Sequence, residues 1–137
     1  MLALSDFPHQ RSESVRYRDT DRQGHVNNAV FSTFYECSRT NILYDPERGL
    51  ISPDREFVIV KIEIDYQAEL NWPGEVEIGT RVIRLGSSSV TSEQAIFQNG
   101  VLASQATSVM VMIDTGSRKA TPLPDSAIKG LNDLMVL

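Results

Sequence analysis

The sequence predicts an α+β fold in which a five-stranded antiparallel sheet curls around one long central helix. Three observations carry this prediction. A wide apolar stripe with helical spacing begins at residue 29, four long segments of strand-like pattern follow it, and short turn sequences join those segments. Strands joined by short turns pair antiparallel. A helix this apolar must be buried, and the sheet is the large surface that can cover it.

The chain begins with a predicted strand and a polar loop. Residues 11–18 favour a short strand with Val15 and Tyr17 on one face. Residues 19–26 are polar and are expected to form the loop that leads into the helix.

The helix is expected to begin at two adjacent asparagines and to run for about four turns. Asn27 or Asn28 can cap it, because a short side-chain oxygen can accept a hydrogen bond from an early helical N–H. Pro46 and Gly49 mark where the helix has ended. Its apolar stripe, which we expect to be core, comprises Val30, Phe31, Phe34, Tyr35, Ser38, Ile42 and Leu43.

The remaining chain is predicted to be mostly strand. Asn99 and Gly100 give the strongest turn signal, since both central positions of a type I′ hairpin turn need a positive φ. A short terminal helix is expected within residues 125–135. The strands are expected to cover residues 57–66, 76–82, 90–98 and 101–114.

Composition excludes several classes of protein. A length of 137 residues fits one domain over residues 1–137, and a net charge of -5 argues against a nucleic-acid partner. The single cysteine cannot form an internal disulfide, which favours the cytoplasm. We expect neither a signal peptide nor a membrane span, and the two histidines and one cysteine are too scattered for a zinc cluster.

Residues 16–28 hold the densest group of reactive side chains. Asp21 is ionised at neutral pH and can serve as a base or nucleophile. Backbone N–H groups at the helix start, near Asn28, can stabilise a developing oxyanion. Gly24 lets the backbone come close to a substrate or adopt a positive φ. His25 can orient water, share a proton with Asp21 or hydrogen-bond a substrate carbonyl.

Structural roles compete with these functional ones. An aspartate before a helix is often a turn former, and Asp19 is the better candidate for tying down the loop. His25 can equally be a loop histidine bonded to backbone, while Asn27 and Asn28 can act mainly as caps. Among these residues and one later turn, we expect substrate contacts from Gly24, Val26, Asn27, Ser88 and Ser89.

Other polar residues are weaker candidates. Glu36 is expected to be solvated or paired with Arg39, and Cys37 to be a small buried filler. The serines at 87–89 can line a path for phosphate or pantetheine, or form a plain turn. Three cations can bind phosphate groups or can simply be solvated surface charges: Arg84, Arg118 and Lys119.

Taken together, the chain resembles hotdog-fold thioesterases of the 4-hydroxybenzoyl-CoA type. The resemblance covers nearly the whole chain and fades after the helix, toward residues 86–89, 114 and 123–124. The residues that carry it are Tyr17, Asp19, Thr20, Asp21, Gly24, His25, Val26, Asn27, Asn28, Tyr35, Glu36 and Arg39.

The resemblance implies a catalytic role for Asp21, as nucleophile or general base. It implies that the N–H near Asn28 polarises the thioester carbonyl. His25 is common in the acyl-CoA and acyl-carrier-protein branches and absent from the 4-hydroxybenzoyl-CoA enzymes, which favours a short- to medium-chain acyl group. Members are usually dimers or dimers of dimers with active sites shared between subunits.

The sequence therefore predicts an acyl-CoA thioesterase that uses no metal or other cofactor and forms a homodimer or homotetramer. A monomer would leave a sheet edge unpaired. We expect no nucleic-acid or membrane partner. Three alternatives remain open: an acyl-thioester hydratase or dehydratase on the same fold, an acyl-carrier-protein thioesterase, and a non-catalytic acyl-thioester-binding protein.

Overall fold

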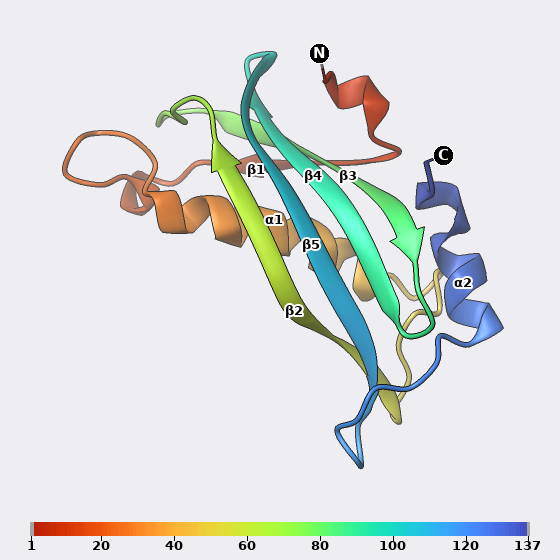
Figure 1. Ribbon diagram of the computed structural model, residues 1–137. Helices are drawn as coiled ribbons and strands as arrows, with labels where there is room; N and C mark the ends of the chain where they lie inside the picture. Colours follow the sequence, from red (N-terminus) through yellow and green to blue (C-terminus); the bar gives the residue numbers. More distant parts are fainter. Residues whose placement is uncertain (1, 137) are drawn as a thin grey trace.

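The computed structural model describes residues 2–136, and a five-stranded antiparallel sheet dominates it (Figure 1). The strand order is β1-β3-β4-β5-β2, which confirms the predicted sheet. The strands are β1 (His9–Ser14), β2 (Arg55–Tyr66), β3 (Glu75–Leu85), β4 (Ser89–Gln98) and β5 (Val101–Asp114). The helices are α1 (Asn28–Leu43) and α2 (Asp125–Leu131), with 3-10 turns η1 (Leu4–Asp6), η2 (Tyr17–Asp19) and η3 (Asn132–Leu134).

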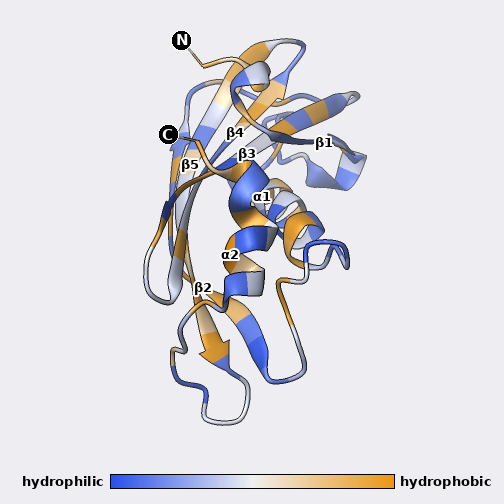
Figure 2. Ribbon diagram, turned by 90° about the vertical axis from the view of Figure 1, so that its right-hand side faces the viewer, coloured by the Kyte–Doolittle hydropathy of each residue, from blue (hydrophilic) through white to orange (hydrophobic). Residues whose placement is uncertain are grey.

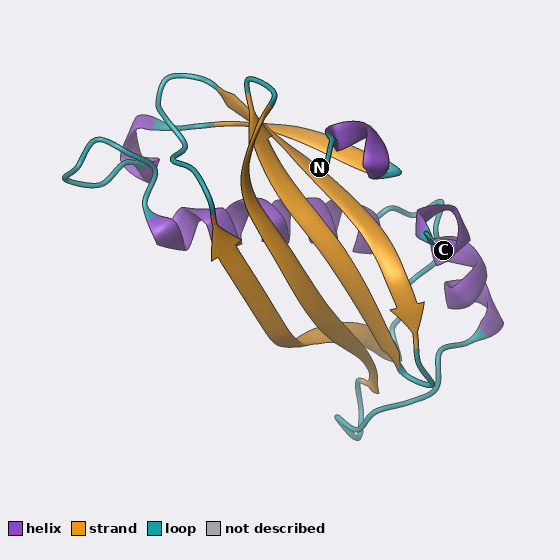
Figure 3. Cartoon of the chain, turned by 45° about the horizontal axis from the view of Figure 1, so that its top comes forward, coloured by secondary structure: helices purple, strands orange, loops and turns teal. Residues whose placement is uncertain are grey.

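The two helices lie on the same side of the sheet (Figure 2). Helix α1 has 16 residues and crosses behind the strands in Figure 3. The predicted single central helix therefore describes only part of this layer, because α2 packs Ala127 and Leu131 into the same core region as Ile42 of α1. Within residues 2–136, no helix is long and apolar enough to cross a membrane.

Helix α1 begins where the asparagine pair predicts. The side-chain oxygen of Asn27 accepts a hydrogen bond from the N–H of Ala29 at 2.9 Å, so Asn27 is the cap and Asn28 the first helical residue. Most of the predicted stripe is buried, but Val30 and Leu43 are only half-buried, and Arg39, which was not part of the stripe, is buried. The buried members of the helix are Phe31, Phe34, Tyr35, Ser38, Arg39 and Ile42.

The prediction for the first strand is wrong in position. Strand β1 ends at Ser14, and residues 17–19 form the 3-10 turn η2. Val15 is buried but Tyr17 is 72% exposed, so the two do not share a core face. The carboxylate of Asp19 accepts a hydrogen bond from the N–H of Arg16 at 2.8 Å, and this local contact turns the chain where alternation alone suggests a strand.

A polar layer joins α1 to the sheet. The hydroxyls of Ser38 and Thr80 are 2.8 Å apart, and the amide nitrogen of Gln94 donates to Thr80 Oγ1 at 3.0 Å. That amide group also donates to the carbonyl of Tyr35 at 3.1 Å and accepts from Arg39 at 3.3 Å. All five residues are buried, so these bonds satisfy polar groups that would otherwise be costly inside the protein.

The N-terminal segment covers part of the opposite face of the sheet. Phe7 packs edge-on against Phe97, with ring centroids 6.4 Å apart. It also lies directly over Gly79, where an added Cβ would stand 2.5 Å from the Phe7 ring. Glycine at this position of β3 is therefore what lets the aromatic ring sit flat on the sheet.

Candidate active site

The loop before α1 is closed by main-chain hydrogen bonds at both ends. Thr20 and Val26 form an isolated antiparallel bridge, and inside it the N–H of Asp21 donates to the carbonyl of His25 at 2.8 Å. Gly24 has a φ of 85°, which other residues adopt only at a cost. The loop is thereby folded back so that Asp21 and His25 stand opposite each other across a tight turn.

Asp19 holds the base of this loop, the structural role expected for it. Its carboxylate is 2.9 Å from the Arg16 guanidinium, and its carbonyl accepts from the N–H of Asn27 at 2.8 Å. Burial works against the charged carboxylate, but the hydrogen bonds from Arg16 hold the pKa of Asp19 below its ordinary value. Asp19 is only 2% exposed, so it is positioned to support the loop and not to meet a substrate.

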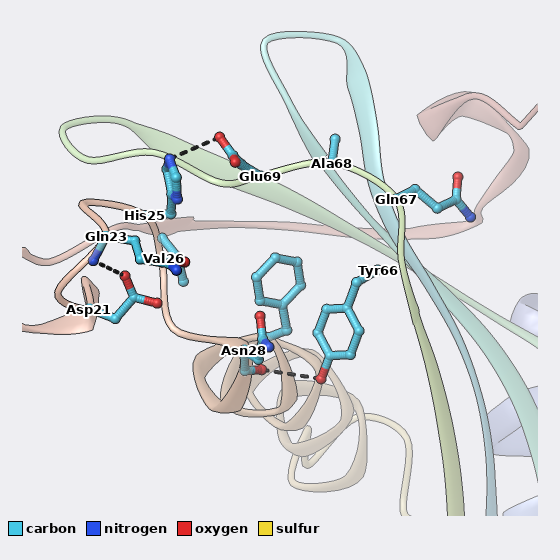
Figure 4. Close-up of a pocket in the computed structure, with 10 residues that line it drawn as sticks. Asp21, Gln23, His25, Val26, Asn28, Tyr66, Gln67, Ala68 and Glu69 are labelled. Atoms are coloured by element: carbon cyan, nitrogen blue, oxygen red, sulfur yellow. Dashed lines mark hydrogen bonds and ion pairs between the residues drawn. The ribbon is translucent and has the colours of Figure 1, made fainter.

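A cavity of about 320 Å³ lies beside the loop, at the N-terminal end of α1 (Figure 4). One wall comes from the loop and the first turn of α1, and the other from the end of β2 and the chain that follows it. Its lining residues are Asp21, Gln23, His25, Val26, Asn28, Phe31, Tyr66, Gln67, Ala68 and Glu69. Four predicted site residues, at positions 21, 25, 26 and 28, therefore meet in one cavity.

The side chains of Asp21 and His25 both face the cavity region but have separate partners. The Asp21 carboxylate accepts a hydrogen bond from the N–H of Gln23 at 2.8 Å. The imidazole Nε2 of His25 is 3.0 Å from a carboxylate oxygen of Glu69. Within residues 2–136 the two side chains share no hydrogen bond, so proton exchange between them would need a bridging water or substrate.

The first turn of α1 supplies a free donor. Asn28 lines the cavity, and over the described part of the chain its N–H has no hydrogen-bond acceptor. Its carbonyl accepts a bond from the Tyr66 hydroxyl at 3.3 Å, which fixes the far wall against the helix. Phe31 meets Tyr66 edge-to-face at 5.0 Å, so the inner wall is aromatic. An acyl group can lie against this wall while its carbonyl oxygen points at the helix start.

Glu69 and Tyr66 are cavity residues that the sequence patterns do not predict. Phe31 belongs to the predicted core stripe, and it is buried while also lining the cavity. Glu69 and Tyr66 reach the cavity because the N–H of Val26 donates to the carbonyl of Leu70 at 2.9 Å, pinning the loop to the chain after β2. Because this bond joins residues far apart in the sequence, the local spacing of apolar residues cannot predict it.

The predicted substrate contacts at Ser88 and Ser89 lie elsewhere in this chain. Tyr66 pairs with Ser104 of β5, whereas Ser89 pairs with Val111, so the serine turn stands about 23 Å from the cavity along the strands. Within one chain the structure does not bring Ser88 and Ser89 to Asp21. Gly24 and Asn27 flank the cavity without lining it.

The remaining candidates have structural surroundings. Glu36 is exposed on α1 and forms no ion pair with Arg39 in the described part of the chain. Cys37 is half-buried, so it is more exposed than the small buried residue that the sequence predicts. Burial and the nearby Glu13 raise the pKa of its thiol. A raised thiol pKa disfavours a thiolate nucleophile.

Comparison with known proteins assigns the class. Residues 15–131 match the family model of the thioesterase-like superfamily, and the chain belongs to that family. Its architecture is that of the hotdog thioesterases.

Particular relatives are similar over most of their length. The acyl-CoA thioester hydrolase YbgC of Escherichia coli is 29% identical over 118 residues, covering 83% of this chain and 88% of that protein. A thioesterase from Thermus thermophilus, solved in complex with coenzyme A and zinc, is 33% identical with a TM-score of 0.80. The match covers 93% of this chain and 94% of that one. A predicted thioesterase from Bacillus stearothermophilus is 27% identical with a TM-score of 0.83, covering 93% and 96%.

Proposed function

We propose that the protein hydrolyses acyl thioesters of coenzyme A, with Asp21 as general base or nucleophile. The observation that carries the proposal is the meeting of the Asp21 carboxylate, the His25 imidazole and the free N–H of Asn28 around one cavity. The relatives named acyl-CoA thioester hydrolase and the coenzyme A complex of a similar thioesterase support the choice of carrier.

The chemistry needs three events at the carbonyl carbon. An oxygen nucleophile adds, the carbonyl oxygen becomes an oxyanion, and the carbon–sulfur bond breaks. As general base, Asp21 takes a proton from water while the water oxygen bonds to the carbonyl carbon. The Asn28 N–H, already oriented by the helix, binds the oxyanion. When the tetrahedral intermediate collapses the carbon–sulfur bond breaks, and the proton held by Asp21 passes to the departing sulfur, which leaves the free acid and the thiol.

His25 assists this step and bears on the acyl group. As a neutral imidazole it can accept a hydrogen bond from the attacking water on its unprotonated nitrogen and so orient that water. The aromatic wall of Phe31 and Tyr66 and the modest cavity favour a short- to medium-chain acyl group. The proposal includes no metal or other cofactor, because a carboxylate, water and an oxyanion donor are sufficient for hydrolysis. We place this activity in the cytoplasm, where an unpaired thiol such as Cys37 stays reduced.

The cavity is electrostatically incomplete for coenzyme A. Among its lining residues are two carboxylates, Asp21 and Glu69, and no lysine or arginine. Coenzyme A carries phosphates that need cationic partners. We infer that these cations come from a second copy of the chain.

The outer edge of β2 is the surface for that copy. Strand β2 is last in the sheet order, and within residues 2–136 the sheet pairs it on one side only, with β5. Ile59 and Val60, in the middle of β2, are 46% and 59% exposed. An antiparallel pairing of two β2 strands would set the Arg55 end of one beside the Tyr66 end of the other. Ser88 and Ser89 of the partner subunit would then approach the cavity, as would the partner's Arg118.

The test is a free-thiol release assay over acyl-CoAs from acetyl to palmitoyl, with benzoyl-CoA included. We expect turnover by the wild type and a loss of about a hundredfold or more in Asp21→Asn, the scale of a positioned base. Asp125→Asn, an exposed carboxylate at the start of α2, is the matched control and should retain activity.

Other results would change the proposal. If the protein hydrolyses acyl groups carried by an acyl-carrier protein but no coenzyme A thioester, the proposed substrate changes from acyl-CoA to the acyl-carrier protein. Loss of double-bond absorbance from an enoyl-CoA without thiol release would indicate a hydratase. Binding of acyl-CoA without turnover, with no effect of Asp21→Asn, would indicate a binding protein.

A further inference from the structure

We propose that Glu69 is a positioning residue that fixes the imidazole of His25 for the reaction. The inference rests on the proposed function, because it assigns a task to a residue in the same cavity. Its starting point is the 3.0 Å contact between Glu69 Oε2 and His25 Nε2, which is drawn as a dashed line in Figure 4.

The chain that carries Glu69 is held firmly on its N-terminal side. The N–H groups of Gln67 and Ala68 both donate to the carbonyl of Ala103, at 2.8 and 3.0 Å. Two bonds to one acceptor stop the strand pairing of β2 and turn the chain toward the cavity. Glu69 follows directly, so its backbone position is set by the neighbouring strand β5.

The C-terminal side is held equally well. The side-chain amide of Gln98 accepts from the N–H of Asn71 and donates to its carbonyl, both at 2.9 Å. Leu70 is fully buried, and its carbonyl accepts the N–H of Val26, the residue after His25. This last bond sets the register that places positions 25 and 69 side by side.

The pairing determines which imidazole nitrogen carries a proton. An ionised carboxylate only accepts hydrogen bonds, so the Nε2 atom of His25 must be the protonated one. In the neutral imidazole the free lone pair is then on Nδ1, which has no hydrogen-bond partner within the described residues. Glu69 thus selects one tautomer and one ring orientation, leaving Nδ1 for water or substrate.

A purely structural ion pair would behave differently. His25 is 34% exposed at its side chain and Glu69 64%, and pairs this exposed add little to folding stability. Removing Glu69 should therefore leave thermal stability nearly unchanged. The effect expected from positioning is on kcat, with little on KM, because the ring is misplaced only for the chemical step.

The kinetic experiment uses Glu69→Ala, Glu69→Gln, His25→Ala and the double variant carrying both alanines. We expect Glu69→Ala to lower kcat about tenfold, with KM within about twofold of wild type. Glu69→Gln should recover most of the rate, because its amide oxygen still accepts from Nε2–H. Glu69→Ala should cost nothing more in the His25→Ala background. The control is Glu93→Gln on β4, whose carboxylate is partly exposed and paired with Arg81 at 3.3 Å, away from both the cavity and the β2 edge.

A second measurement does not depend on turnover. Long-range proton–nitrogen NMR spectra of the imidazole should show the Nε2–H tautomer in the wild type and a mixture in Glu69→Ala. A wild-type Nδ1–H tautomer would overturn the proposal, as would additive losses in the double variant or an effect confined to KM. If the wild type hydrolyses no thioester, the proposed function fails, and the spectra alone decide the role of Glu69.

Discussion

The hydroxyl of Tyr35 donates a hydrogen bond to Ser104 Oγ at 2.7 Å, deep between α1 and β5. The Ser104 hydroxyl in turn donates a hydrogen bond to the carbonyl of Asp65 at 2.7 Å. Asp65 immediately precedes Tyr66, which forms a wall of the cavity. Burial raises the pKa of Tyr35 far above its ordinary value, so the phenol stays a neutral donor throughout the working range of pH. The centre of the helix and the edge of the site are thus connected by two hydrogen bonds.

Removing this hydroxyl should destabilise the fold. Tyr35→Phe keeps the packing of the ring but leaves Ser104 without its buried donor, which should cost about 1 to 2 kcal/mol in the free energy of unfolding. Urea denaturation followed by circular dichroism measures the change. Tyr44→Phe, an exposed tyrosine just after α1, is the control and should be neutral.

The buried carboxylate of Asp19 should make stability sensitive to acid. Its pKa in the folded protein lies below the ordinary value of 3.8, so the ionised form favours folding. This stabilisation is complete above that ordinary value and is lost as the pH falls through the folded-state pKa. Asp19→Asn should lose about 2 kcal/mol at pH 7, and the difference from wild type should shrink below pH 4. Urea midpoints at several pH values test this, and a difference independent of pH would refute the assignment.

The positive φ of Gly24 should matter for activity more than for stability. In Gly24→Ala the new Cβ would meet no atom within 4 Å, so the cost is confined to the backbone, about 1 kcal/mol. Gly100 has the same open surroundings and a φ of 77°, but it lies in the β4–β5 hairpin outside the cavity. We expect both alanine variants to lose similar stability and only Gly24→Ala to lose activity, because its strain moves Asp21. Equal activity losses would count against this view.

A charge on the β2 edge should separate the proposed dimer. Val60→Lys places an ammonium at an exposed position of the edge strand β2, where a second copy would have to desolvate it. Light scattering should report the mass of one chain, and thiol release should fall with it. Ile83→Lys is the matched control, since Ile83 is also exposed and apolar and, like Val60, is skipped at a register shift, but it lies on β3, inside the sheet order. A wild type with the mass of one chain would end the dimer proposal.

Much of the fold follows from local sequence patterns. The strand over 101–114 is predicted to the residue, and Asn99 and Gly100 do adopt the positive φ values of 52° and 77° that their hairpin turn requires. The first strand is misplaced because Asp19 bonds to nearby backbone, and a short-range polar contact of this kind overrides alternation. The second helix was expected, but its position on the sheet depends on packing that no local pattern encodes.

The site divides in the same way. Asp21, His25, Val26 and Asn28 are near in sequence, so one dense motif identifies them together. Glu69 meets His25 only because the chain after β2 is pinned to the loop by a hydrogen bond between distant residues. Contacts of this origin appear only once the sheet is assembled.

The polar layer beneath α1 has a consequence for how such an enzyme can change its substrate. Apolar contacts let a helix slide by small steps, whereas the bonds from Ser38 and Arg39 to the sheet are short-ranged and directional. The helix is therefore anchored along its axis, and its first turn keeps its place when cavity side chains are exchanged. Mutations at Phe31 or Ala68 can then reshape the proposed acyl site while the N–H of Asn28, the proposed oxyanion donor, stays fixed. Evolution can vary substrate choice and catalytic geometry independently.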